Sequence, residues 1–377
     1  MTLGRMRHWG VRLAAAGAVG IGLGLLRTPD RTWAGLLIAS FGLAAAGVGG
    51  VVFIALCTVS GATWPVAFRR IPEALAAALP AGALGLAAVF LLRPTLYPWL
   101  AGETLHGFKG AWLSPAFFFT RAAIYLGLWA LFAWLIVRTS RAQDHDGSAR
   151  HTARRIKLSA AFVVIFALSF WLASYDWIMS LEPHWYSTIF GVYNFAGLFS
   201  CVVAIVVLLA MGLRRAGLLQ PALRDEHLHD LGKLLFAFSS FWMYIWFCQA
   251  MLIWYTNIPE ESVYYVRRLE GSWATLFYLN VALNWVVPFV LLLTRQAKRT
   301  RMIAYAAGVV LLGRWLDLYL MIWPAAIAGA PHVGIGEIAP AVAAAGLLLL
   351  AFARSFASAP PVPLRDPALS ASLHYHS

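Results

Sequence analysis

The sequence contains few charged residues. Only 12% of its 377 residues are charged, whereas 61% are hydrophobic and the mean hydropathy is +0.73. A typical soluble domain has about 25% charged residues and is about half apolar. This composition excludes an ordinary soluble protein and predicts an integral membrane protein with nearly all of its length in the bilayer.

Residues that commonly hold redox cofactors are also scarce. The three cysteines, Cys57, Cys201 and Cys248, are far apart and have no iron–sulphur or zinc spacing. All histidines fall in predicted loops or tails, whereas a membrane b-type haem usually needs axial histidines from the middle of a span. No Rossmann or P-loop glycine pattern occurs. We therefore predict no intrinsic haem, iron–sulphur, metal or nucleotide site. Electrons in any redox function would pass through partner proteins.

The formal net charge of +13 has a topological explanation. Lys and Arg of membrane proteins gather in cytoplasmic loops, so this charge does not indicate nucleic-acid binding.

Ten segments are apolar and long enough to cross a bilayer, which takes about 20 residues. They are 11–26, 33–57, 74–92, 116–137, 157–179, 189–213, 233–255, 273–294, 302–327 and 338–354. The predicted fold is an all-α polytopic membrane protein. It has one integral membrane domain over 1–355 and a loose, Pro- and Ser-rich cytoplasmic tail over 356–377. Proline, glycine and charge break up the segment 93–115, which is expected to lie at the membrane interface.

The positions of Lys and Arg predict the orientation. Most of them lie at the two termini and in the connections after the even-numbered spans. We therefore place both termini in the cytoplasm and the turn between the fifth and sixth spans outside. The basic residues assigned to the outer connections are Arg27, Arg31, Arg93, Lys109, Arg267 and Arg268.

Polar residues in or beside the spans are candidates for a proton pathway or a quinone site, because ionisable groups in a bilayer are costly and usually functional. Arg314 and Asp317 are three residues apart, so they share one helix face and are expected to pair. The candidates are Arg121, Asp176, Glu182, His184, Tyr193, Lys233, Gln249, Asn280, Asn284, Arg314 and Asp317.

Each candidate also has a purely structural interpretation. Arg314 and Asp317 would then form an ion pair that locks two helices together. Lys233, near Asp230 at the inner edge of the seventh span, would be a snorkelling residue. Asn280 and Asn284, one turn apart, would hydrogen-bond neighbouring helices.

Three stretches resemble one family. They are 174–193 (SYDWIMSLEPHWYSTIFGVY), 229–238 (HDLGKLLFAF) and 242–261, which contains YIWF and NIPEE. Together they resemble the F subunit (quinone-binding subunit 2) of alternative complex III, a bacterial quinol:cytochrome c (or other acceptor) oxidoreductase. The resemblance is dense over about 170–320 and loose elsewhere.

The resemblance implies a polysulphide-reductase-like (NrfD-like) arrangement of two four-helix bundles plus peripheral helices. It implies a bacterial inner-membrane location and quinone or quinol as a ligand of the complex. The implied partners are a homologous C membrane subunit, an iron–sulphur subunit and c-type haem subunits. In this family proton conduction is the commoner proposal for the F subunit, and the better-supported quinol site is on the C subunit.

Proton conduction and quinone binding would use the same residues. A carboxylate such as that of Asp176 would accept a proton from a quinol hydroxyl, with Arg121 or Arg314 nearby. A relay would connect several of these groups across the membrane. The choice depends on whether an apolar, ring-sized cleft opens beside Asp176. A secondary transporter with a midplane Arg–Asp site and a purely structural scaffold are the alternatives.

Overall fold

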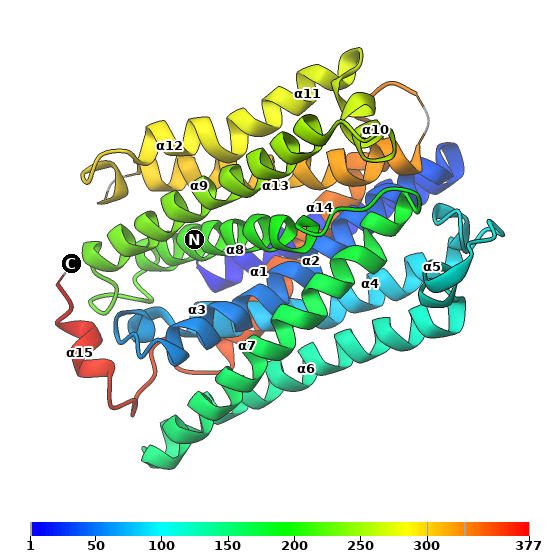
Figure 1. Cartoon of the computed structure of the whole chain (residues 1–377). Helices are drawn as coiled ribbons and strands as arrows, with labels where there is room; N and C mark the ends of the chain where they lie inside the picture. Colours follow the sequence, from blue (N-terminus) through cyan, green and yellow to red (C-terminus); the bar gives the residue numbers. More distant parts are fainter. Residues whose placement is uncertain (1, 300, 328, 377) are drawn as a thin grey trace.

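The computed structural model describes residues 2–299, 301–327 and 329–376 and is all-helical over that part of the chain. Residues 1, 300, 328 and 377 lie outside the described residues. They include the first residue of the predicted membrane domain and the last residue of the predicted tail. Ten helical segments are long and apolar enough to cross a membrane, as predicted (Figure 1). They are α1 (Leu3–Arg27), α2 (Pro29–Val59), α3 (Arg70–Leu75) with α4 (Leu79–Leu92), α6 (Pro115–Asp146), α7 (Ala149–Trp177), α8 (Phe190–Arg215), α9 (Asp225–Thr256), α11 (Ser272–Val281) with α12 (Val287–Leu292), α13 (Met302–Ala326) and α14 (Ile335–Ala357).

The spans form two groups of four. The first group contains α2, the α3–α4 segment, α6 and α7, and the second contains α8, α9, the α11–α12 segment and α13. In Figure 1, α9, α11 and α12 lie along the top of the view, and α6 and α7 lie along the bottom. The α2–α8, α7–α8 and α2–α13 contacts join the groups. This arrangement agrees with the expected pair of four-helix bundles.

The remaining spans, α1 and α14, pack on each other and on α2 as peripheral helices. A Cβ at Gly17 would lie 2.4 Å from the Ala343 backbone nitrogen, and one at Gly20 would lie 2.6 Å from the Ala339 Cβ. Glycine therefore allows this close antiparallel contact. Both chain ends consequently lie at one end of the bundle. We call it the inner end, and we call the opposite end, with residues 178–189, the outer end.

Two spans are not continuous α-helices. Residues Ala76–Ala78 form a 3₁₀ turn between α3 and α4, and residues Ala282–Val286 form a π-turn between α11 and α12. The π-turn ends two residues before Pro288. Proline has no backbone N–H, so the regular hydrogen-bond ladder is interrupted there.

Short segments cover the outer end. They include α5 (Gly107–Trp112) within the predicted interfacial segment and α10 (Pro259–Leu269). Trp99 donates its indole N–H to the Ser180 carbonyl at 3.2 Å, and the Tyr97 hydroxyl donates to the Trp177 carbonyl at 2.7 Å. These bonds hold the connection between α4 and α6 against the end of α7.

The C-terminal tail differs from the loose segment that its composition predicts. Its short helix α15 (Leu369–Leu373) packs on the 3₁₀ segment η1 (Trp64–Phe68), where Ala67 N–H donates to the fully buried Ser372 hydroxyl at 3.0 Å. The Tyr375 hydroxyl donates to Asp230 on α9. The reason for the difference is that the tail satisfies polar groups of η1 and α9, and composition gives no information on such contacts.

The predicted orientation can be tested at His184, whose side chain is 80% exposed at the outer end. A His184→Cys variant in intact spheroplasts should react with a membrane-impermeant thiol reagent, because the outer end is expected to face the periplasm. Labelling only after lysis would reverse the orientation. The natural cysteines are partly buried, and the unsubstituted protein is the background control.

Candidate functional site

The first buried centre joins α6 to α7 near the outer end. Arg121 forms two parallel bonds with the Asp176 carboxylate, Nε to Oδ2 at 2.9 Å and Nη2 to Oδ1 at 2.8 Å. The Trp112 indole N–H donates to Oδ1 at 2.8 Å and the Tyr125 hydroxyl to Oδ2 at 3.3 Å. Asp176 is 1% exposed. Four donors occupy the four lone-pair positions of this carboxylate, so a further donor must replace one of them.

Helix α5 covers this centre. The Trp112 carbonyl accepts from Arg121 Nη1 at 2.8 Å, and the guanidinium carbon lies 4.1 Å from the centroid of the Trp112 ring. Lys109 donates to the Pro183 carbonyl at 2.6 Å and so ties α5 to the outer turn. Trp112 therefore supplies a hydrogen bond to the anion and a cation–π contact to the cation.

An apolar pocket of about 420 Å³ opens beside the first centre. Leu113, Leu172, Met179 and Trp185 form part of its wall. The polar residues of the lining include Asp176, Trp112, Lys109 and Ser180. Small-molecule sites usually have volumes of about 300–1,000 Å³ and a mainly apolar lining with a few polar groups. The pocket has the size and lining of a site for an apolar ring with a hydroxyl group.

The second buried centre lies in the other four-helix group. Arg314 and Asp317 on α13 form the predicted pair, with Nη1 2.6 Å from Oδ2. The Trp242 indole N–H from α9 also donates to Oδ2, at 3.2 Å. Asn280 from α11 donates to Oδ1 at 3.1 Å, and the Tyr193 hydroxyl from α8 is hydrogen-bonded to the same oxygen. The fully buried carboxylate thus connects all four helices of this group.

Close contact between Gly197 and the Arg314 side chain positions the second centre. A Cβ on Gly197 of α8 would lie 2.3 Å from Arg314 Nη1, so a side chain at this position would displace the guanidinium. Arg314 Nη2 donates to the Asn194 side chain at 2.8 Å. Asn284, within the π-turn, donates to the Asn280 side chain at 2.7 Å and so orients the amide that contacts Asp317.

A third network, at the inner end, was not predicted. Glu73, 1% exposed, accepts from Arg69, Arg70 and Ser140, while Arg70 also pairs with Asp144. The only sequence signal was Arg69-Arg70 three residues before Glu73 at the start of a span. We assigned both arginines to a cytoplasmic connection. The network itself depends on the contact with α6, which local spacing does not encode.

Asp366 of the tail extends this network. It accepts from Arg69 Nη1 at 2.6 Å and from Arg155 Nη2 at 3.1 Å. Burial alone raises the pKa of the Asp366 carboxyl, but Arg69, the Ala368 N–H and Arg155 outweigh burial and hold the pKa below its usual range. The carboxylate therefore stays charged at neutral pH, and its stabilising contribution is lost as the pH falls through the folded-state pKa.

The remaining predicted residues lie outside the two buried centres. Glu182 accepts from the fully buried Arg268 at 2.9 Å and ties the outer turn to α10, and His184 contacts Glu103 on the surface. Lys233 pairs with Asp230 at the inner edge of α9. Gln249 is buried on α9, two turns beyond Trp242, and its amide nitrogen has no hydrogen-bond partner.

Buried hydroxyls continue from the second centre toward the inner end. Ser200 on α8 and Ser239 on α9 are 4% and 1% exposed, and neither hydroxyl has a hydrogen-bond partner in the structure. Along α9, Ser239 lies between Trp242 and the Asp230–Lys233 pair. Buried polar groups without a protein partner are the places where internal water binds.

No model of a known protein family matches the chain, and no curated protein matches it either. The fold and the buried side chains define the class of protein, a multi-pass α-helical integral membrane protein with charged residues among its helices.

Proposed function

We propose that this protein is an integral membrane subunit of a quinol-oxidising respiratory complex of the alternative complex III type. In this proposal the two buried Arg–Asp centres have different roles. The Asp176 centre binds a quinone or quinol, and the Asp317 centre belongs to a proton pathway. The observation that carries the proposal is the apolar pocket of about 420 Å³ beside Asp176.

The pocket supports quinone binding because it combines an apolar wall with one carboxylate. Quinol oxidation releases two protons and two electrons. A quinol hydroxyl would take the place of the Trp112 indole N–H on Asp176 Oδ1 and transfer one of the two protons to that oxygen, and the second proton would leave to water at the outer end. Arg121 would hold the carboxylate in position, and the electrons would pass to the redox centres of partner subunits.

The second four-helix group supports proton conduction because its polar groups are spread along the membrane normal. Gln249 lies on the outer side of the Asp317 centre, and Ser200 and Ser239 lie on its inner side. The Asp230–Lys233 pair follows at the inner edge of α9. Water bound to these unpaired groups would complete a hydrogen-bonded chain, which is how proton relays cross membranes.

Co-purification tests whether the protein belongs to a complex with haem-containing subunits. When the tagged protein is extracted from its native membrane in mild detergent, we expect c-type haem absorbance to elute with it, because the electron carriers belong to partner subunits. The separated chain should be colourless, since no histidine lies within a predicted span and no cysteines cluster.

A haem or iron–sulphur spectrum in the separated chain would contradict the expected absence of intrinsic cofactors. Elution of the chain alone, without haem, would favour the secondary-transporter alternative with its Arg314–Asp317 site.

A further inference from the structure

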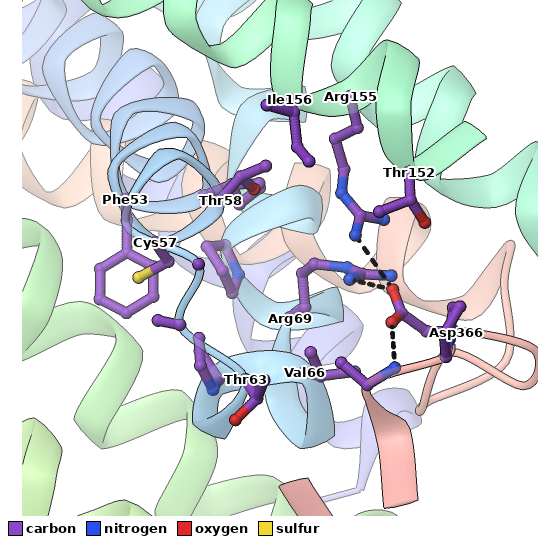
Figure 2. Close-up of a pocket in the computed structure, with 17 residues that line it drawn as sticks. Phe53, Cys57, Thr58, Thr63, Val66, Arg69, Thr152, Arg155, Ile156 and Asp366 are labelled. Carbon is purple, nitrogen blue, oxygen red and sulfur yellow. Dashed lines mark hydrogen bonds and ion pairs between the residues drawn. The ribbon is translucent and has the colours of Figure 1, made fainter. Parts of the chain in front are cut away.

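A second pocket, at the inner end, has features of an anion site. It has a volume of about 150 Å³ and lies between α2, α7 and the C-terminal tail (Figure 2). Figure 2 shows Arg69 and Arg155 converging on Asp366, with Thr152 beside them. The structure thus already holds one carboxylate in this position, which demonstrates that the two guanidinium groups can bind an oxyanion.

Asp366 does not bind all of the N–H donors of Arg69 and Arg155. Arg69 Nη2 and Arg155 Nε are buried and have no hydrogen-bond partner, and both side chains are only 7% exposed. Buried guanidinium N–H groups are costly when unpaired. These two donors therefore favour an additional acceptor with several oxygen atoms, and a phosphate group provides one.

The rest of the pocket wall indicates where this acceptor comes from. Ile54 and Cys57 of α2 and Ile156 of α7 line it, and all three belong to or border predicted membrane spans. Ile156 is 45% exposed, so the rim of the pocket reaches the lateral surface of the helix bundle. A ligand with a charged head and an apolar chain fits this combination. Basic pockets between membrane helices at the cytoplasmic side commonly bind anionic lipid headgroups.

We propose that this pocket binds the phosphate headgroup of an anionic phospholipid through Arg69 and Arg155. The phosphate oxygens accept from the two unused donors, and the lipid chain lies along the apolar surface of α2 and α7. Asp366 is a fixed negative charge within the same site and opposes the incoming phosphate. The proposal is independent of quinone binding and of proton conduction.

Two substitutions should change the affinity for anionic phospholipid in opposite directions. Arg155→Gln removes a cation from the site, so we expect it to weaken binding of phosphatidylglycerol about tenfold, the loss of roughly one charge-assisted hydrogen bond. Asp366→Asn removes the opposing charge and should tighten binding. Arg154→Gln is the matched control, because Arg154 is an exposed neighbour on α7 that does not line the pocket.

Native mass spectrometry of the delipidated protein measures these affinities, with phosphatidylcholine and inorganic phosphate as separate arms. We expect retention of phosphatidylglycerol but not of phosphatidylcholine, and little competition by inorganic phosphate. Equal binding of both lipids, or unchanged binding in both Arg155→Gln and Asp366→Asn, would overturn the site. Inorganic phosphate that competes as well as the lipid would overturn the lipid assignment. Asp366→Asn keeps the test informative even if Arg155→Gln fails to fold.

Discussion

Asp176→Asn should leave a protein that assembles in the membrane but supports little quinol oxidation. Asparagine keeps the shape and one acceptor oxygen, and Arg121 keeps its bond to the Trp112 carbonyl and its contact with the Trp112 ring. The amide cannot accept a proton, however. A positioned acid or base contributes about 10²–10⁴-fold in rate, so turnover should fall by that factor. Quinol oxidation by membranes, normalised to the amount of complex, measures it.

The alternative outcome for Asp176→Asn is also specific. If the carboxylate only neutralises Arg121, its removal leaves a buried cation, which typically costs about 3–5 kcal/mol, and the subunit should disappear from the membrane. Wild-type assembly with wild-type quinol oxidation and proton release would eliminate both interpretations. Trp112→Phe is the matched variant because it removes the indole N–H from Asp176 and retains the Arg121 pair. It should assemble normally and change the apparent affinity for quinol.

Asp317→Asn should have a larger effect on assembly than Asp176→Asn. Asp317 is fully buried and accepts from side chains on four helices, and without it Arg314 keeps its bond to the neutral Asn194 side chain. Loss of the charge leaves the Arg314 cation buried without a counter-ion, at a cost of about 3–5 kcal/mol. Thermal unfolding of the purified protein and its amount in the membrane report this loss.

The double variant Arg314→Gln/Asp317→Asn separates structure from proton transfer. It removes both charges, so it should be more stable than Asp317→Asn alone, since the two residues contact each other and their effects are not additive. Proton movement should stay impaired in the rescued protein if Asp317 is a relay station. Restored proton movement would show that Asp317 only balances the charge of Arg314.

The fold was largely predictable because bilayer thickness constrains each span. Segments of about 20 apolar residues identify the ten helices, and three-residue spacing predicts the Arg314–Asp317 pair, which is confirmed. The predicted spans do not give the helix ends. The span predicted over 116–137 lies within a helix that continues to Asp146, and its last turns carry Ser140 and Asp144, which bind the network around Glu73.

The division of the candidates into two centres was not predictable. Hydropathy places Asp176 and Asp317 inside spans but gives no information on which helices are neighbours. The partners Trp112 and Tyr125 lie far from Asp176 in sequence, and their roles depend on how α5 and α6 pack. The ordered tail was missed for the same reason, because Asp366 and Arg69 come together across nearly the whole chain.

The tail has a consequence for the order of biosynthesis. It follows all ten spans in the sequence, so the ribosome releases it after every helix has been made. Arg69 and Arg155 are therefore translated before Asp366, the residue that binds both of them. Contact of the tail with η1 and α9 then joins two segments that are far apart in the sequence. The contacts of the tail at the inner end therefore form only after all ten spans have been translated.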